Sequence, residues 1–208
     1  MLSATFLTNV ATTHTTKQNT IFFKLQHSNQ LQLQLQLQLQ KKNSHWKVTD
    51  VGGQIHERAT WYEEYEECDG IIFVLSLADF DQASQDKRNA NKFVEDGINL
   101  LVQVMKVDSL QGVPLVIMLN KRDVFADKIK VSKTGISCTF PEYKGNLNSP
   151  EESEEFIKKL VTGIITSETE SENSLYVTQA TDTNLVGGVL ANVLQTIVKQ
   201  RMKDFGFS

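Results

Sequence analysis

Apolar residues in this chain occur in short continuous runs that alternate with stretches of helical spacing. Two runs, residues 70–78 and 113–119, are almost wholly apolar, which is typical of strands buried on both faces of a sheet. Shorter strands are predicted up to Asp50 and over residues 175–178. Between the two long runs, apolar residues recur at helical spacing and predict one face of an amphipathic helix: Phe93, Gly97, Leu100, Leu101, Val104 and Met105.

Two further helices are predicted on either side of the last strand. Ser149 is placed as an N-cap and Glu152 as a capping-box residue, with Pro150 in the first turn, for a helix that ends near residue 165. A long final helix is predicted over residues 184–203. Strands that alternate with helices predict an α/β fold with a doubly wound, mostly parallel sheet. Ligands of such sheets bind in loops beyond the carboxyl ends of the strands.

Residues 1–46 form an arm whose composition differs from that of the domain over residues 47–208. Residues 31–40 are five consecutive Leu-Gln pairs. Their period of two would place every leucine on one face of a strand, which could extend a β-hairpin. The alternative is a poorly ordered low-complexity insertion. Neither interpretation assigns chemistry to the repeat.

Charge and cysteine content exclude several classes of function. The first 49 residues carry +5 of a net charge of −4, which leaves −9 on the rest and argues against a nucleic-acid-binding surface. Neither Cys68 nor Cys138 has a Cys or His at metal-ligand spacing, so neither a disulfide framework nor a zinc site is expected. The apolar runs are far shorter than the ~20 residues that span a bilayer, so direct membrane insertion is not expected.

Three loops at predicted strand ends carry the candidate chemistry, and the second is the most specific. In order they are Asp50-Val51-Gly52-Gly53-Gln54, Asn120-Lys121-Arg122-Asp123 and Thr178-Gln179-Ala180-Thr181-Asp182-Thr183. The Asp123 carboxylate can accept two hydrogen bonds from the N1 and N2 edge of guanine, an edge that adenine lacks. The Lys121 stem would cover the ring, and the Asn120 amide would brace the loop. The Ala180 N–H could reach guanine O6.

Motifs of these three kinds in this order are the organisation of a regulatory GTPase, and longer stretches identify the family. Those stretches are DVGGQIHER at residues 50–58, IIFVLSLA at 71–78, DFDQ at 79–82, PEY at 141–143 and KDFG at 203–206. Over residues 47–208 the chain resembles the alpha subunits of heterotrimeric G proteins. The resemblance implies a partial P-loop GTPase of Ras-like fold that acts as a modulator or transducer in transmembrane receptor signalling.

The resemblance also implies GTP or GDP and Mg²⁺ as cofactors. Asp50 would hold Mg²⁺ through water, the Gly53 N–H would contact the terminal phosphate, and Gln54 would be the catalytic residue that orients the attacking water. Thr16, beside Thr15 and ahead of a candidate strand over residues 20–25, is a second candidate magnesium ligand, with a chance pair of threonines as the alternative. The implied nucleotide-binding residues are Asp50, Val51, Gly52, Gly53, Gln54, Asn120, Lys121, Arg122, Asp123 and Ala180.

Partners are implied by the same resemblance. Glu57, Arg58 and Trp61 lie on the expected switch II helix, which in the family contacts effectors and the beta-gamma dimer. Residues 184–208 match the final helix that the family presents to a G-protein-coupled receptor. The implied location is therefore cytoplasmic, with the chain held at the inner face of the plasma membrane by its partners. No particular effector is implied.

The sequence departs from the family pattern ahead of the first motif. No glycine precedes Gly52 and no arginine precedes Arg58, so these residues contain no Gly-x-x-x-x-Gly-Lys-Ser/Thr phosphate loop, helical domain or catalytic arginine. The alternatives are a signalling GTPase, a non-catalytic module that binds beta-gamma or a receptor, and an expressed but unfolded truncation without a biochemical role. The absent segment would supply the family's central strand. The sheet is therefore expected to lack that strand unless the Leu-Gln repeat or a partner fills the gap.

Overall fold

The computed structural model describes residues 19–24, 46–51, 68–84, 91–168, 174–179 and 183–204. The Leu-Gln segment, the Thr15-Thr16 pair and the expected switch II helix lie outside these residues. None of the helices in the described part of the chain is both long and apolar enough to cross a membrane.

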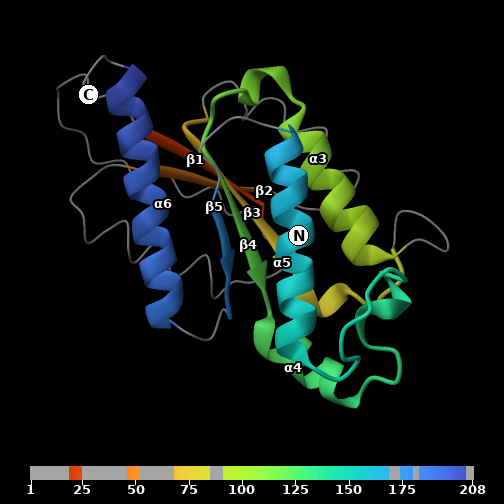
Figure 1. Cartoon of the computed structure of the whole chain (residues 1–208). Helices are drawn as coiled ribbons and strands as arrows, with labels where there is room; N and C mark the ends of the chain where they lie inside the picture. The colour runs from red at the N-terminus through yellow and green to blue at the C-terminus, as the bar shows by residue number, and fades with distance from the viewer. Residues whose placement is uncertain are drawn as a thin grey trace.

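A five-stranded sheet forms the centre of the described structure, and every neighbouring pair of strands is parallel (Figure 1). Its order is β2-β1-β3-β4-β5. The strands are β1 (Asn19–Lys24), β2 (Trp46–Val51), β3 (Gly70–Ser76), β4 (Leu115–Asn120) and β5 (Ser174–Val177). The predicted α/β class and mostly parallel sheet are confirmed.

The expectation that the sheet would lack a central strand is wrong, because the position between β2 and β3 is filled. Strand β1 lies between β2 and β3, in register from Asn19 opposite Trp46 on one side and from Ile21 opposite Gly70 on the other. Its sequence, NTIFFK, is rich in the β-branched and aromatic residues that favour strands. A strand from the N-terminal arm, rather than the Leu-Gln repeat or a partner, therefore fills the position.

Strand boundaries differ slightly from the predicted ones. Strand β3 ends at Ser76 instead of residue 78, because a single 3₁₀ turn follows at Leu77–Asp79 (η2). The Ser76 hydroxyl donates to the Asp79 carboxylate at 3.1 Å across this turn. Strand β4 begins at Leu115 and extends to Asn120, one residue beyond the prediction. The correction at β4 places Asn120 on the strand itself.

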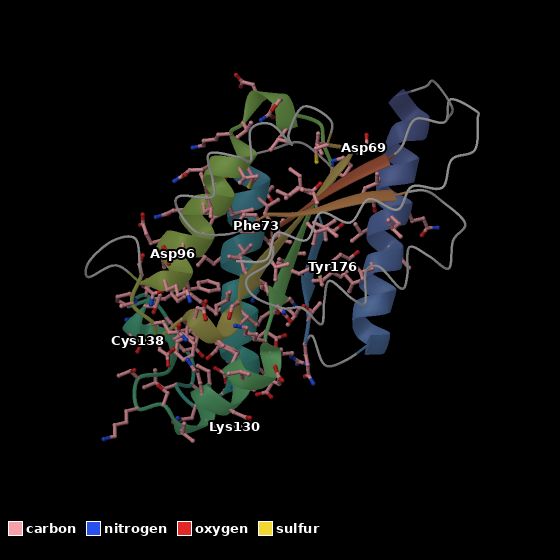
Figure 2. All side chains as sticks on the ribbon, turned by 180° about the vertical axis from the view of Figure 1, so that it is seen from behind. Asp69, Phe73, Asp96, Lys130, Cys138 and Tyr176 are labelled. Carbon is pink, nitrogen blue, oxygen red and sulfur yellow. The ribbon has the colours of Figure 1, made fainter. Side chains whose placement is uncertain are left out.

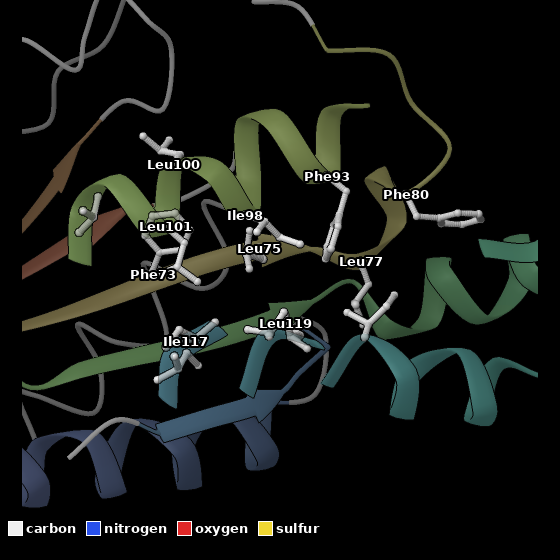
Figure 3. Close-up of a cluster of buried hydrophobic side chains, with 14 of the residues drawn as sticks. Phe73, Leu75, Leu77, Phe80, Phe93, Ile98, Leu100, Leu101, Ile117 and Leu119 are labelled. Atoms are coloured by element: carbon white, nitrogen blue, oxygen red, sulfur yellow. The ribbon is translucent and has the colours of Figure 1, made fainter. Parts of the chain in front are cut away.

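Helices cover both faces of the sheet (Figure 1). Successive side chains of β3 and β4 point to opposite faces, and apolar residues on each face are buried. Phe73 and Ile117 belong to the larger buried cluster, which Figure 3 shows between the strands and the segment that includes α3. Ile72 and Met118 belong to a second cluster against α6 (Thr183–Asp204), where Tyr176 also packs (Figure 2). Both faces of these strands are therefore buried, as their apolar sequences predicted.

The predicted amphipathic helix begins as a π-helical segment, Phe93–Ile98 (η3), and continues as α3 (Asn99–Met105). All the residues predicted for its apolar face are buried: Phe93, Gly97, Leu100, Leu101, Val104 and Met105. Gly97 has a packing role, since a Cβ there would lie 2.7 Å from the Leu75 Cδ2. The glycine lets this segment approach β3 closely.

Helix α4 (Arg122–Val131) follows β4 directly, and α5 (Pro150–Glu168) precedes β5. Short 3₁₀ turns, η4 (Asp108–Leu110) and η5 (Gly135–Cys138), lie in the connections. The predicted cap of α5 is confirmed in part: the Ser149 hydroxyl accepts from the Glu152 N–H at 3.2 Å. The capping-box carboxylate does not return this bond. Glu152 instead accepts from the Asn146 N–H at 2.9 Å, while the Ser149 N–H donates to the Asn146 carbonyl.

Candidate functional site

The loops after β4 and β5 are joined by hydrogen bonds at the carboxyl edge of the sheet. The Thr178 N–H donates to the Leu119 carbonyl at 2.7 Å, and the Thr178 hydroxyl donates to the Asn120 side-chain oxygen at 3.3 Å. Thr178 and Asn120 are both buried. Because parallel strands end at the same edge, two predicted loops that are distant in sequence meet there.

Lys121 turns the chain from β4 into α4. Its φ of 60° and ψ of 40° place it in the left-handed region, which only a small minority of non-glycine residues adopt. Its carbonyl accepts from the Phe125 N–H at 2.9 Å and so starts the first turn of α4. This backbone geometry costs energy, and such costs concentrate at functional loops.

The Asp123 side chain lies in the first turn of α4 and is partly exposed. Within the described part of the chain, neither the Asp123 carboxylate nor the Lys121 ammonium has a hydrogen-bonding or ion-pairing partner. A partly exposed carboxylate in this state can accept hydrogen bonds from a ligand. Among the described residues, the unpartnered charged groups of this loop are therefore the two that were predicted to contact the base directly.

Arg122 has a different arrangement. Its backbone N–H donates to the Thr178 carbonyl at 3.3 Å, and its side-chain Nε lies 2.6 Å from the Glu154 Oε2 on α5. The side chain is thus occupied by α5, and its predicted contact with nucleotide stays a prediction. Sequence reasoning missed Glu154, because nothing in its local pattern distinguishes it from the neighbouring acids of α5.

Other predicted site residues are described incompletely or not at all. Asp50 and Val51 end β2, so the backbone brings them to the same edge of the sheet as Asn120. Their predicted nucleotide and magnesium contacts stay predictions. The remaining predicted residues lie outside the described ranges: Thr16, Gly52, Gly53, Gln54, Glu57, Arg58, Trp61 and Ala180. Among the described residues, no group of three His, Cys, Asp or Glu could hold a metal ion.

The Thr178–Asn120 hydrogen bond can be tested by stability. Thr178→Val keeps the shape of the side chain and removes the hydroxyl. We expect it to lower the free energy of unfolding by about 1–3 kcal/mol, because the buried Asn120 oxygen loses its donor. Urea denaturation of the wild type, Thr178→Val and the hydroxyl-bearing control Thr178→Ser would measure this. A Thr178→Val protein as stable as the wild type would contradict the assignment.

Comparison with known proteins agrees with this geometry. Residues 7–197 match the family model of the G-protein alpha subunit. The guanine nucleotide-binding protein alpha-7 subunit of Dictyostelium discoideum is 35% identical over 163 residues, which are 77% of this chain and 40% of that protein. The alpha-6 subunit of Caenorhabditis elegans is 32% identical over 165 residues, 79% of this chain and 44% of that protein. The chain spans less than half the length of these relatives. By the extent of the family match, the chain belongs to the G-protein alpha subunit family.

Proposed function

We propose that this chain is an alpha-subunit-like signalling protein that recognises guanine through the loop after β4. The observation that carries the proposal is that some side chains of this loop are bonded to neighbouring segments while others are not. Asn120 and Arg122 bond to the neighbouring segments, whereas Lys121 and Asp123 keep their charged groups free among the described residues. The loop is thus anchored by two residues and presents a carboxylate and an ammonium group to a ligand. Such an arrangement can bind a planar base.

The chemistry of the carboxylate favours guanine over adenine. Guanine offers an N1–H and an N2 amino group side by side, and both oxygens of Asp123 can accept from them. Adenine has no hydrogen at N1, so its binding would leave the carboxylate unpaired. Sites built around such hydrogen bonds reject analogues that lack the donor by large factors. The aliphatic stem of Lys121 would cover one face of the ring.

Phosphate contacts are the weaker part of the proposed site. The 208 residues contain no Gly-x-x-x-x-Gly-Lys-Ser/Thr loop, so base contacts carry most of the affinity of this chain. We expect a dissociation constant of about 1 mM, which corresponds to about −4 kcal/mol. Hydrolysis is not expected to exceed background, because the arginine that shares transition-state charge is absent from these residues as well. The proposed signalling role therefore depends on partner binding rather than turnover.

The proposed partners are a beta-gamma dimer at Glu57, Arg58 and Trp61 and a receptor at the final helix. The inner face of α6 is buried against the sheet at Val189, Leu190, Val193, Leu194 and Ile197. Its exposed positions include Asn192 and Gln195. A receptor that bound this part of α6 would therefore contact a polar surface.

Nucleotide titration monitored by protein NMR tests the proposal at the expected affinity. Addition of GDP should shift resonances of residues 120–123 and 178–179, and ADP at equal concentration should not. The base-recognition set predicts this selectivity, and the absent phosphate loop predicts its weakness. Equal responses to GDP and ADP would refute guanine recognition. Submicromolar binding of GTP would refute the expectation that the base carries most of the affinity.

A further inference from the structure

Arg122 connects three segments of the site that are far apart in sequence. It opens α4 directly after the strained Lys121, its N–H donates to Thr178 after β5, and its guanidinium contacts Glu154 on α5. We propose that the Arg122–Glu154 pair positions Asp123 for guanine, with Arg122 acting as a positioning residue rather than as a base contact. This inference rests on the proposed function and specifies how its selectivity arises.

The support for the pair comes from α5. Glu154 is only 15% exposed in its side chain, and its neighbour Ser153 is fully buried, with the Ser153 hydroxyl 3.5 Å from the Tyr143 oxygen. One turn along α5, Phe156 packs against the Tyr143 ring with centroids 5.2 Å apart. These contacts hold this turn of α5 in place against the Tyr143 side chain. The carboxylate is therefore a rigid anchor for the more exposed Arg122 side chain.

Arg122 immediately precedes Asp123, so the Arg122–Glu154 pair can influence the orientation of the Asp123 carboxylate. Asp123 is the next residue, so a rotation of the first turn of α4 would move its carboxylate. The left-handed backbone at Lys121 favours such a rotation, because a relaxed loop would release its conformational cost. The backbone bond to Thr178 and the side-chain bond to Glu154 oppose it from two directions. Loss of the side-chain bond would leave the backbone bond to Thr178 and the packing of Phe125 to hold this turn.

A partly exposed salt bridge contributes little to global stability. Removal of the pair should therefore change the ratio of affinities for GDP and inosine diphosphate more than the free energy of unfolding. Two hydrogen bonds from guanine need both oxygens of Asp123 in place, whereas hypoxanthine, which lacks the N2 amino group, needs only one. The ratio of affinities for GDP and inosine diphosphate thus reports the orientation of the carboxylate.

The test compares wild type with Arg122→Gln and Glu154→Gln by NMR titration with GDP and with inosine diphosphate. For both variants we expect affinity for GDP to fall about fivefold, the scale of one such interaction, with little change for inosine diphosphate. The charge-swapped double variant Arg122→Glu with Glu154→Arg should restore the ratio. Lys158→Gln is the matched control, because it breaks the exposed Lys158–Glu155 pair on the same helix and should leave the ratio unchanged.

Each outcome separates the inference from the proposed function. Wild-type selectivity in Arg122→Gln would overturn the positioning role and leave guanine recognition standing. Equal losses for both nucleotides would show a general structural role and would also overturn it. A wild type without preference for GDP over ADP would overturn the proposed function, and the inference with it.

Discussion

Replacement of Asp123 with alanine is expected to abolish detectable binding of GDP while leaving the fold intact. Hydrogen bonds to a charged acceptor contribute about 1.5–3 kcal/mol each, so the loss of two corresponds to a drop of more than about a hundredfold in affinity. Stability should change by about 1 kcal/mol or less. Asp123 has no side-chain partner among the described residues, and its remaining contribution is a favourable charge in the first turn of α4.

The measurement is an NMR titration with GDP, accompanied by thermal unfolding of the same samples. Asp127→Ala is the control on the same helix, because the Asp127 side chain is 81% exposed and, among the described residues, its ion pair is with Lys130 at 3.5 Å. It should retain wild-type binding. An Asp123→Ala protein that binds GDP like this control would show that the carboxylate does not contact the base.

Replacement of Phe125 with alanine is expected to lower the free energy of unfolding by about 3–5 kcal/mol. Phe125 is fully buried and meets the Phe80 ring edge to face, with centroids 5.5 Å apart. A small domain is stable by about 5–15 kcal/mol, so this loss would remove a large part of the total. It would also weaken the attachment of α4, whose first turn carries Asp123, to the turn after β3.

Urea denaturation followed by circular dichroism would measure this change. Val124→Ala provides the control, since the neighbouring Val124 is 43% exposed and its truncation should cost little. A midpoint for Phe125→Ala that equals the midpoint for Val124→Ala would contradict the packing role of the Phe125 ring.

Some of the arrangement around the site could be read from local pattern. The apolar runs that became β3 and β4 predicted burial on both faces, because a strand covered on two sides must be apolar at successive positions. The helical spacing from Phe93 to Met105 predicted a buried face for the same reason of periodicity. The proposed guanine-binding set was also identified from the sequence, since the donors on guanine require a carboxylate such as Asp123.

Contacts between distant segments could not be predicted from local sequence pattern. Hydrogen bonds join Thr178 to Asn120 and Arg122 to Glu154 across 58 and 32 residues, and no local period encodes either pairing. The capping-box glutamate illustrates the same limit. Glu152 satisfied the motif, but its carboxylate accepts from the Asn146 N–H of the preceding loop.

Local pattern predicted the burial of β3, β4 and the segment that includes α3, because hydrophobic periodicity can be judged from near neighbours. It also identified Asp123 as a carboxylate that could accept from guanine, because hydrogen-bonding capacity belongs to the side chain. Tertiary packing, rather than local pattern, places β1 between β2 and β3, since any strand with two free edges can pair there. It also decided that Lys121 takes a left-handed conformation and that Arg122 turns toward α5. Both depend on where β4, β5 and α5 meet, and that meeting is set by packing over the whole domain.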